Sequence, residues 1–149
     1  MKYTEEISNK LNELLVKNYD AEKGYINAVE NVESPTLKIF FQRRARERSE
    51  FAKELRAEIL LYGQEPKESG SFKGAVHRNW MSLKSLFSSN DEEAILEEAI
   101  RGEESSLEEY NEILKDKTLP PSIDSLLINQ KKAIQAAINT EKVHEELVS

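Results

Sequence analysis

The feature that most limits the fold is a long apolar stripe at helical spacing near the start of the chain. From about Thr4 to Val32, apolar residues recur at alternating intervals of three and four, as they do on one face of an α-helix. They are Ile7, Leu11, Leu14, Ala21, Tyr25, Ala28 and Val32. The stripe predicts an amphipathic helix over residues 4–32.

A second helix follows almost at once. Ser34 is a favourable N-cap, and Pro35 suits the first helical position because proline needs no hydrogen-bond acceptor there. Gly63 is a plausible residue to end the helix. The apolar face between them consists of Leu37, Phe41, Phe51, Leu55, Ile59 and Tyr62.

Two more helices occupy the second half of the chain. The third begins near Asn90 or Asp91 and ends near Asp116, and Ser122 is the predicted cap of the fourth, which extends to Val148. Their apolar residues are Ile95, Leu96, Ala99, Gly102, Leu107, Tyr110 and Leu114, and then Ile123, Leu126, Leu127, Ile134, Ala137, Ile138 and Val148. The pattern predicts an all-α protein.

The connections between the helices suggest how they pair. Tight joints link the first two helices and the last two, so each pair is expected to form an antiparallel hairpin. Residues 64–90 lie between the pairs, a length unusual for a structureless loop within a compact domain. Residues 76–87 within it are expected to form a short helix. Two helical hairpins joined by one long crossover make a ferritin-like four-helix bundle, which we expect to be a single domain over residues 1–149.

Composition narrows the possible partners and location. The net charge of −7 argues against nucleic acid and anionic membranes as main partners, because both require a positive field. The absence of cysteine excludes disulfides and thiolate chemistry, and fits a cytoplasmic protein. No apolar run approaches the roughly 20 residues of a membrane span, and the N-terminus lacks the apolar segment of a secretory signal.

A ferritin-like bundle raises the hypothesis of a di-iron or di-manganese centre. Such a centre needs a Glu from each of two helices and a Glu-x-x-His pair from each of the other two. One pair is present, Glu141 and His144 in "TEKVHEE", and Glu22 and Glu103 could add carboxylates. The second pair is missing: the second helix has "ARERSEF" there, and its arginines would repel metal ions.

Several polar residues interrupt the apolar stripes near the middles of the helices. We therefore favour a buried Arg–Glu–Asn–Gln network over a metal centre, since arginine is always charged and prefers a carboxylate partner. Its simplest form pairs Arg48 or Arg44 with Glu103 or Glu22. The expected members of the network are Asn18, Arg44, Arg48, Glu103 and Gln130. Neither a catalytic residue nor a cofactor is favoured; iron or manganese is the alternative.

The stretch "GSFKGAVHRNW", residues 70–80, stands out within the crossover. It is not a phosphate-binding loop, because it lacks the Gly-Lys-Ser/Thr sequence directly before a helix and has no preceding strand. We expect it to pack the crossover onto the bundle, and the alternative is a small-anion site at His77 and Arg78. Its conspicuous residues are Gly70, Ser71, Gly74, His77, Arg78 and Trp80.

Four segments together resemble a known family: "GYINAV" (24–29), "RSEFAKEL" (48–55), "GSFKGAVHRNWMSLK" (70–84) and "GEE" (102–104). They are similar to an uncharacterised bacterial family of four-helix-bundle domains of unknown function within the ferritin-like superfamily. The resemblance implies a ferritin-like bundle and a bacterial cytoplasmic protein. It implies no activity.

The leading functional expectation is a non-enzymatic structural or interaction protein. Analogy with ferritin-like proteins suggests a stress-associated role. We expect it to act through a helical face, as a homodimer or larger homo-oligomer or with another protein partner. The alternative is a metal-binding carboxylate bundle with Glu22, Glu103, Glu141 and His144 as ligands.

Overall fold

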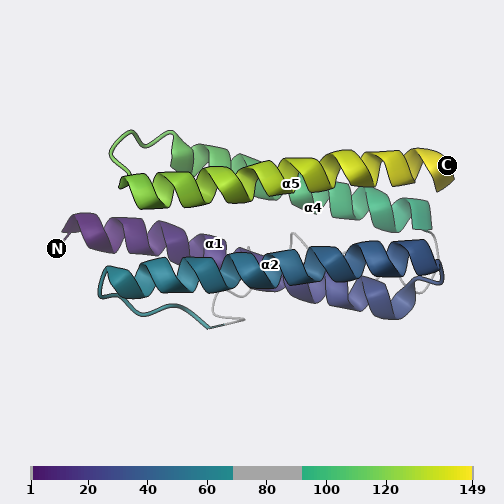
Figure 1. Ribbon diagram of the computed structural model, residues 1–149, viewed down its shortest axis with the longest axis horizontal. Helices are drawn as coiled ribbons and strands as arrows, with labels where there is room; N and C mark the ends of the chain where they lie inside the picture. Colours follow the sequence, from purple (N-terminus) through teal and green to yellow (C-terminus); the bar gives the residue numbers. More distant parts are fainter. Residues whose placement is uncertain (1, 69–91, 149) are drawn as a thin grey trace.

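The computed structural model describes residues 2–68 and 92–148, and within these ranges it has four α-helices and no strand. The helices are α1 (Lys2–Asn31), α2 (Pro35–Leu61), α4 (Glu92–Leu114) and α5 (Pro121–Val148) (Figure 1). The prediction of four long helices is confirmed. The 70–80 stretch and the expected short helix over 76–87 lie outside the described residues. None of the described helices has a stretch long and apolar enough to cross a membrane.

The four helices share one long axis (Figure 1). Helix α1 packs mainly against α2, and α4 packs mainly against α5. The backbone N–H of Ser34 donates to Glu92 Oε2 at 3.1 Å, so α2 and α4 begin at the same end of the bundle. Lys10 pairs with Asp116 at 3.5 Å near the other end. Helix α2 therefore ends far from the point where α4 begins.

The ends of α2 follow the predicted signals. Ser34 has extended backbone, and its hydroxyl accepts a hydrogen bond from the N–H of Leu37 at 3.3 Å, with Pro35 next in the chain. Gly63 has a φ of 74°, a left-handed conformation that glycine adopts without the steric cost a side chain would add.

The predicted cap of the last helix is wrong by two residues, because the N-cap position falls at Pro120 instead of Ser122. Helix α5 begins at Pro121, so Ser122 lies inside the first turn. The carbonyl of Pro120 already accepts a helical hydrogen bond from the N–H of Asp124 at 3.0 Å. Proline at the first position is favourable because its φ is fixed near the helical value and its missing N–H is not needed there.

The apolar core consists of two clusters that follow one another along the bundle. The first cluster takes residues 7–15 of α1 and 51–59 of α2, with Tyr110 and much of α5. The second takes residues 21–32 of α1, 37–45 of α2 and 95–99 of α4. All seven residues of the predicted stripe are buried, six of them on α1 and the seventh, Val32, directly after it. On α1, α2 and α4 the two clusters are separated by a stretch near the middle of the helix. Buried polar side chains occupy this position along the bundle.

A buried polar layer as the candidate functional site

An ion pair between α2 and α4 lies at the centre of this polar layer. Arg48 Nη2 donates to Glu103 Oε1 at 2.8 Å, and each side chain is only 1 % exposed. The guanidinium also donates to Asn18 Oδ1 at 2.7 Å and to the Ser106 hydroxyl at 3.2 Å. One arginine thereby links α1, α2 and α4.

A chain of hydrogen bonds extends the layer towards α5. Asn18 Nδ2 donates to the Tyr110 hydroxyl at 3.1 Å, and that hydroxyl donates to Gln130 Oε1 at 2.6 Å. Gln130 Nε2 donates in turn to the carbonyl of Phe51 at 3.3 Å and to Glu54 Oε1 at 3.1 Å. The side chains of Asn18, Tyr110 and Gln130 are buried, whereas Glu54, at which the chain ends, is exposed.

A second branch of the layer runs through Tyr25. Its hydroxyl lies 2.8 Å from Glu103 Oε1 and 3.2 Å from Glu141 Oε1. Tyr25 and Glu141 have no measurable exposure. Among the described residues, Glu103 Oε2 and Glu141 Oε2 have no hydrogen-bond partner. The layer therefore holds two buried carboxyl groups beside one buried guanidinium.

Burial and charge act together on the titration of these groups. Burial raises the pKa of Glu141, and the neighbouring Glu103 raises it further, against the opposing influence of Tyr25, Arg48 and Arg44. Burial raises the pKa of Tyr110 to about 12, although Arg48 and the bond with Asn18 act the other way. Burial would lower the pKa of Arg48, but the charges of Glu103, Tyr110 and Tyr25 together with the hydrogen bond to Glu103 raise it overall.

Five residues were predicted to share this network. Four of them, Asn18, Arg48, Glu103 and Gln130, are linked by the hydrogen bonds described above, with Tyr110 between Asn18 and Gln130. The described bonds do not connect Arg44 to these four. Arg44 Nη1 donates instead to Glu47 Oε1 at 3.1 Å, on its own helix. Its guanidinium lies over the Phe40 ring, 5.4 Å from the centroid. Arg48, one turn along α2, is the arginine that lies against Glu103.

The four alternative metal ligands fit a di-metal centre poorly. Glu22 is half-buried, and the ring of His144 packs against that of Phe40, with centroids 5.1 Å apart. Glu103 and Glu141 meet at the Tyr25 hydroxyl, but the permanent charge of Arg48 lies in direct contact with Glu103. Two metal ions beside a buried guanidinium would be repelled.

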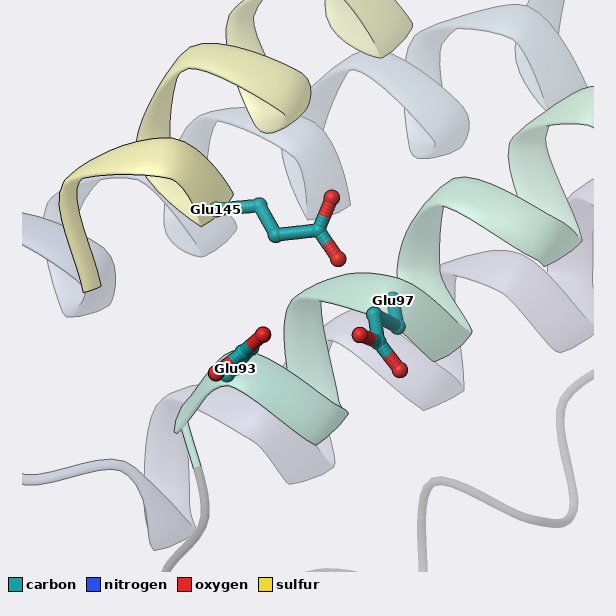
Figure 2. Close-up of side chains that lie close together, drawn as sticks. All are labelled: Glu93, Glu97 and Glu145. Atoms are coloured by element: carbon teal, nitrogen blue, oxygen red, sulfur yellow. The ribbon is translucent and has the colours of Figure 1, made fainter. Parts of the chain in front are cut away.

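Three glutamates come together at one end of the bundle. The sequence indicated an acidic outer face but did not predict that these three side chains would meet. Figure 2 shows Glu93 and Glu97 of α4 facing Glu145 of α5. Their carboxylate oxygens lie within 4.8 Å of one another. Partial burial, together with the charges of Glu97 and Glu93, raises the pKa of Glu145. Carboxylates this accessible commonly occur together without an ion.

Sequence reasoning assigned Tyr25 and Tyr110 to the apolar core and missed their polar role. The signal in the sequence was the choice of tyrosine where phenylalanine would fill the same space, since a buried hydroxyl needs a hydrogen-bond partner.

The sequence analysis also missed Asn12. Its side chain is buried, accepts from the N–H of Lys67 at 2.7 Å, and donates to the carbonyl of Glu65 at 3.2 Å. It ties the segment after α2 to α1.

Comparison with known proteins places the chain in a family without a known activity. No curated protein matches it. The model of one family, described as Domain of unknown function (DUF2383), matches residues 6–116. This span includes Asn18, Tyr25, Arg48 and Glu103 of the polar layer, whereas Gln130 and Glu141 lie beyond it. Because the match covers well over half of the sequence, the chain belongs to the DUF2383 family of domains of unknown function.

Proposed function

We propose that this chain is a non-enzymatic structural or interaction protein of bacterial cytoplasm, with a polar Arg–Glu layer where ferritin-like proteins carry a di-metal centre. Its two antiparallel hairpins and long crossover would give it the ferritin-like connectivity. Analogy with that superfamily favours a stress-associated role. The observation that carries the proposal is the burial of Arg48 against Glu103.

The chemistry of arginine supports this assignment. A guanidinium keeps its charge at any physiological pH and cannot act as a metal ligand. In this layer its nitrogens donate to Asn18, Glu103 and Ser106, and so engage side chains from two other helices. A buried network of this kind fixes which residues face one another, and that is a structural role.

We propose that the interaction surface is the outer face of α1 and α2, and that its partner is a second copy of this chain. A groove of about 270 Å³ lies there, with Ile26, Val29 and Ala45 among its apolar lining. Glu30 of α1 and Arg46 of α2 lie on its polar part. A two-fold axis parallel to α1 and α2 would place each helix of one copy against the other helix of its partner, so that helices carrying opposite charges face each other.

Sedimentation tests the dimer. We expect the wild-type protein to sediment as a dimer and Ile26→Asp, whose parent side chain is 43 % exposed, to sediment as a monomer. Leu61→Asp is the matched control, because Leu61 is 77 % exposed but is not part of the groove. A monomeric wild-type protein, or a dimer unaffected by Ile26→Asp, contradicts the proposed surface.

Metal content tests the polar layer. Protein purified without a His tag is incubated anaerobically with Fe(II) and Mn(II), desalted, and measured for bound metal by mass spectrometry. We expect no bound metal in the wild-type protein. Two ions per chain, lost in Glu103→Ala, would overturn the proposal. Arg48→Gln removes the charge that opposes metal, so metal bound by this variant alone would identify Arg48 as the residue that excludes it.

A further inference from the structure

The Tyr25 hydroxyl lies between two carboxyl groups that come from different helices. Glu103 Oε1, on α4, is 2.8 Å away, and Glu141 Oε1, on α5, is 3.2 Å away. Both are hydrogen-bond distances. All three side chains are buried, so water does not separate them.

A count of the protons at this contact favours one neutral carboxyl group. A tyrosine hydroxyl carries one proton and can donate one such bond, while an ionised carboxylate can only accept. If Tyr25 donates to one carboxylate, the second contact is a hydrogen bond only when the other carboxyl group supplies a proton. Two ionised groups would instead place an unshared negative charge against the phenolic oxygen in a low-dielectric interior.

The surroundings decide which carboxyl group holds that proton. Glu103 accepts from Arg48 Nη2 at 2.8 Å, so a negative charge on Glu103 already has a charged partner. Glu141 forms no ion pair of this kind among the described residues, where its Oε2 has no hydrogen-bond partner. An unpaired carbonyl oxygen of a neutral acid costs less to bury than an unpaired carboxylate oxygen.

The charged and titratable groups that act on Glu141 come from every other described helix: Tyr25 from α1, Arg44 and Arg48 from α2, and Glu103 from α4. The two arginines and the Tyr25 bond favour the ionised form. Burial and Glu103 oppose them, and burial is the largest influence, so the pKa of Glu141 is raised well above its ordinary value. Arg44 also pairs with Glu47, which reduces its effect on Glu141.

We propose that Glu141 is a buried proton-binding site: in the folded protein at neutral pH its carboxylic acid donates to Tyr25, and Tyr25 donates to Glu103. These bonds, with Arg48 to Glu103, all join the α1/α2 pair to the α4/α5 pair. The ligand of the site is the proton itself. Without this proton the layer would hold two negative carboxylates and only one positive guanidinium, that of Arg48. The proton on Glu141 removes the unbalanced negative charge.

The proposal makes packing of the two helix pairs dependent on pH. In the unfolded chain Glu141 titrates near the ordinary value of about 4.3, so folding takes up one proton at higher pH. Its folded pKa is raised, and the stability from the neutral acid is therefore complete below the unfolded pKa. It is lost as pH rises towards the folded pKa. One proton corresponds to a tenfold change in the unfolding equilibrium constant per pH unit.

Urea unfolding from about pH 5 to about pH 7 tests this dependence. Glu141→Gln keeps the donor but cannot ionise, so the wild-type unfolding constant divided by that of the variant should rise about tenfold per pH unit. Glu108→Gln is the matched control, because Glu108 is exposed on α4, and its ratio should stay flat. A flat ratio for Glu141→Gln as well would overturn the proposal.

Infrared spectroscopy reads the proton directly in the wild-type protein, so the test holds even if Glu141→Gln fails to fold. The carbonyl stretch of a neutral carboxylic acid is separate from the bands of carboxylates. We expect this band at pH 7 without added metal, and its presence in Glu108→Gln but not in Glu141→Gln. Its absence from the wild-type spectrum contradicts the inference, whatever the metal measurement shows for the proposed function.

Discussion

Arg48 and Glu103 form an ion pair that neither side chain shares with solvent: Nη2 lies 2.8 Å from Oε1, and each residue is 1 % exposed. Moving two charges from water to a protein interior is costly, and their attraction repays it only with good geometry and further hydrogen bonds. Asn18, Ser106 and Tyr25 provide those bonds. We therefore expect the ion pair to determine how the helices align with one another more than it increases the free energy of unfolding.

Removing one partner should be far more damaging than replacing both. Arg48→Met leaves Glu103 as an uncompensated buried charge, and we expect it to lower the free energy of unfolding by about 3–5 kcal/mol. The double variant Arg48→Met/Glu103→Leu removes both charges and should recover much of that loss. Urea denaturation of the two single variants and the double variant gives the coupling. Additive losses would show that the two side chains do not act as a pair.

The Tyr25 hydroxyl should contribute more than its size suggests. Tyr25→Phe keeps the ring in the core but leaves Glu103 and Glu141 without the group between them, at an expected cost of about 1–3 kcal/mol. Tyr19→Phe is the matched control. Tyr19 accepts from Arg56 at 2.9 Å in an exposed bond, so its change should stay within about 0.5 kcal/mol. Equal effects of the two variants would rule out a special role for Tyr25.

Asn12 should hold the segment after α2 against α1. Asn12→Ala removes a donor and an acceptor that pair with backbone groups of Glu65 and Lys67, and should cost about 1–3 kcal/mol. Hydrogen exchange should quicken at the Lys67 amide in this variant, because that N–H loses its 2.7 Å bond. Unchanged protection at Lys67 would contradict the assignment.

Alkaline titration should distinguish Tyr110. Its pKa in the folded protein is raised to about 12, above the unfolded value of about 10, because burial disfavours the phenolate. The folded state holds this proton more tightly, so the associated stability is complete below about pH 10 and is lost as pH rises through about 12. Phenolate absorbance should show a late step that Tyr110→Phe lacks. Identical titrations of the two proteins would contradict this.

The sequence by itself determined the helices and their buried faces. Spacings of three and four placed Ile7, Leu11 and Leu14 on one side of α1, and all three are buried. Ser34 and Gly63 marked the ends of α2 through local backbone chemistry, which needs no tertiary contact. The error at Ser122 has the same origin, since two residues each suited to a helix start stand side by side, and Pro121 took the first position.

Only the tertiary structure decided which polar side chains meet. Helical periodicity gives the face on which Arg44 and Arg48 lie, but it does not give the level at which another helix presents a carboxylate. Packing put Glu103 opposite Arg48 and left Arg44 to Glu47. It also brought the Tyr25 hydroxyl between Glu103 and Glu141, residues 78 and 116 positions away along the chain. Such contacts depend on the relative shift and rotation of whole helices, which no local pattern encodes.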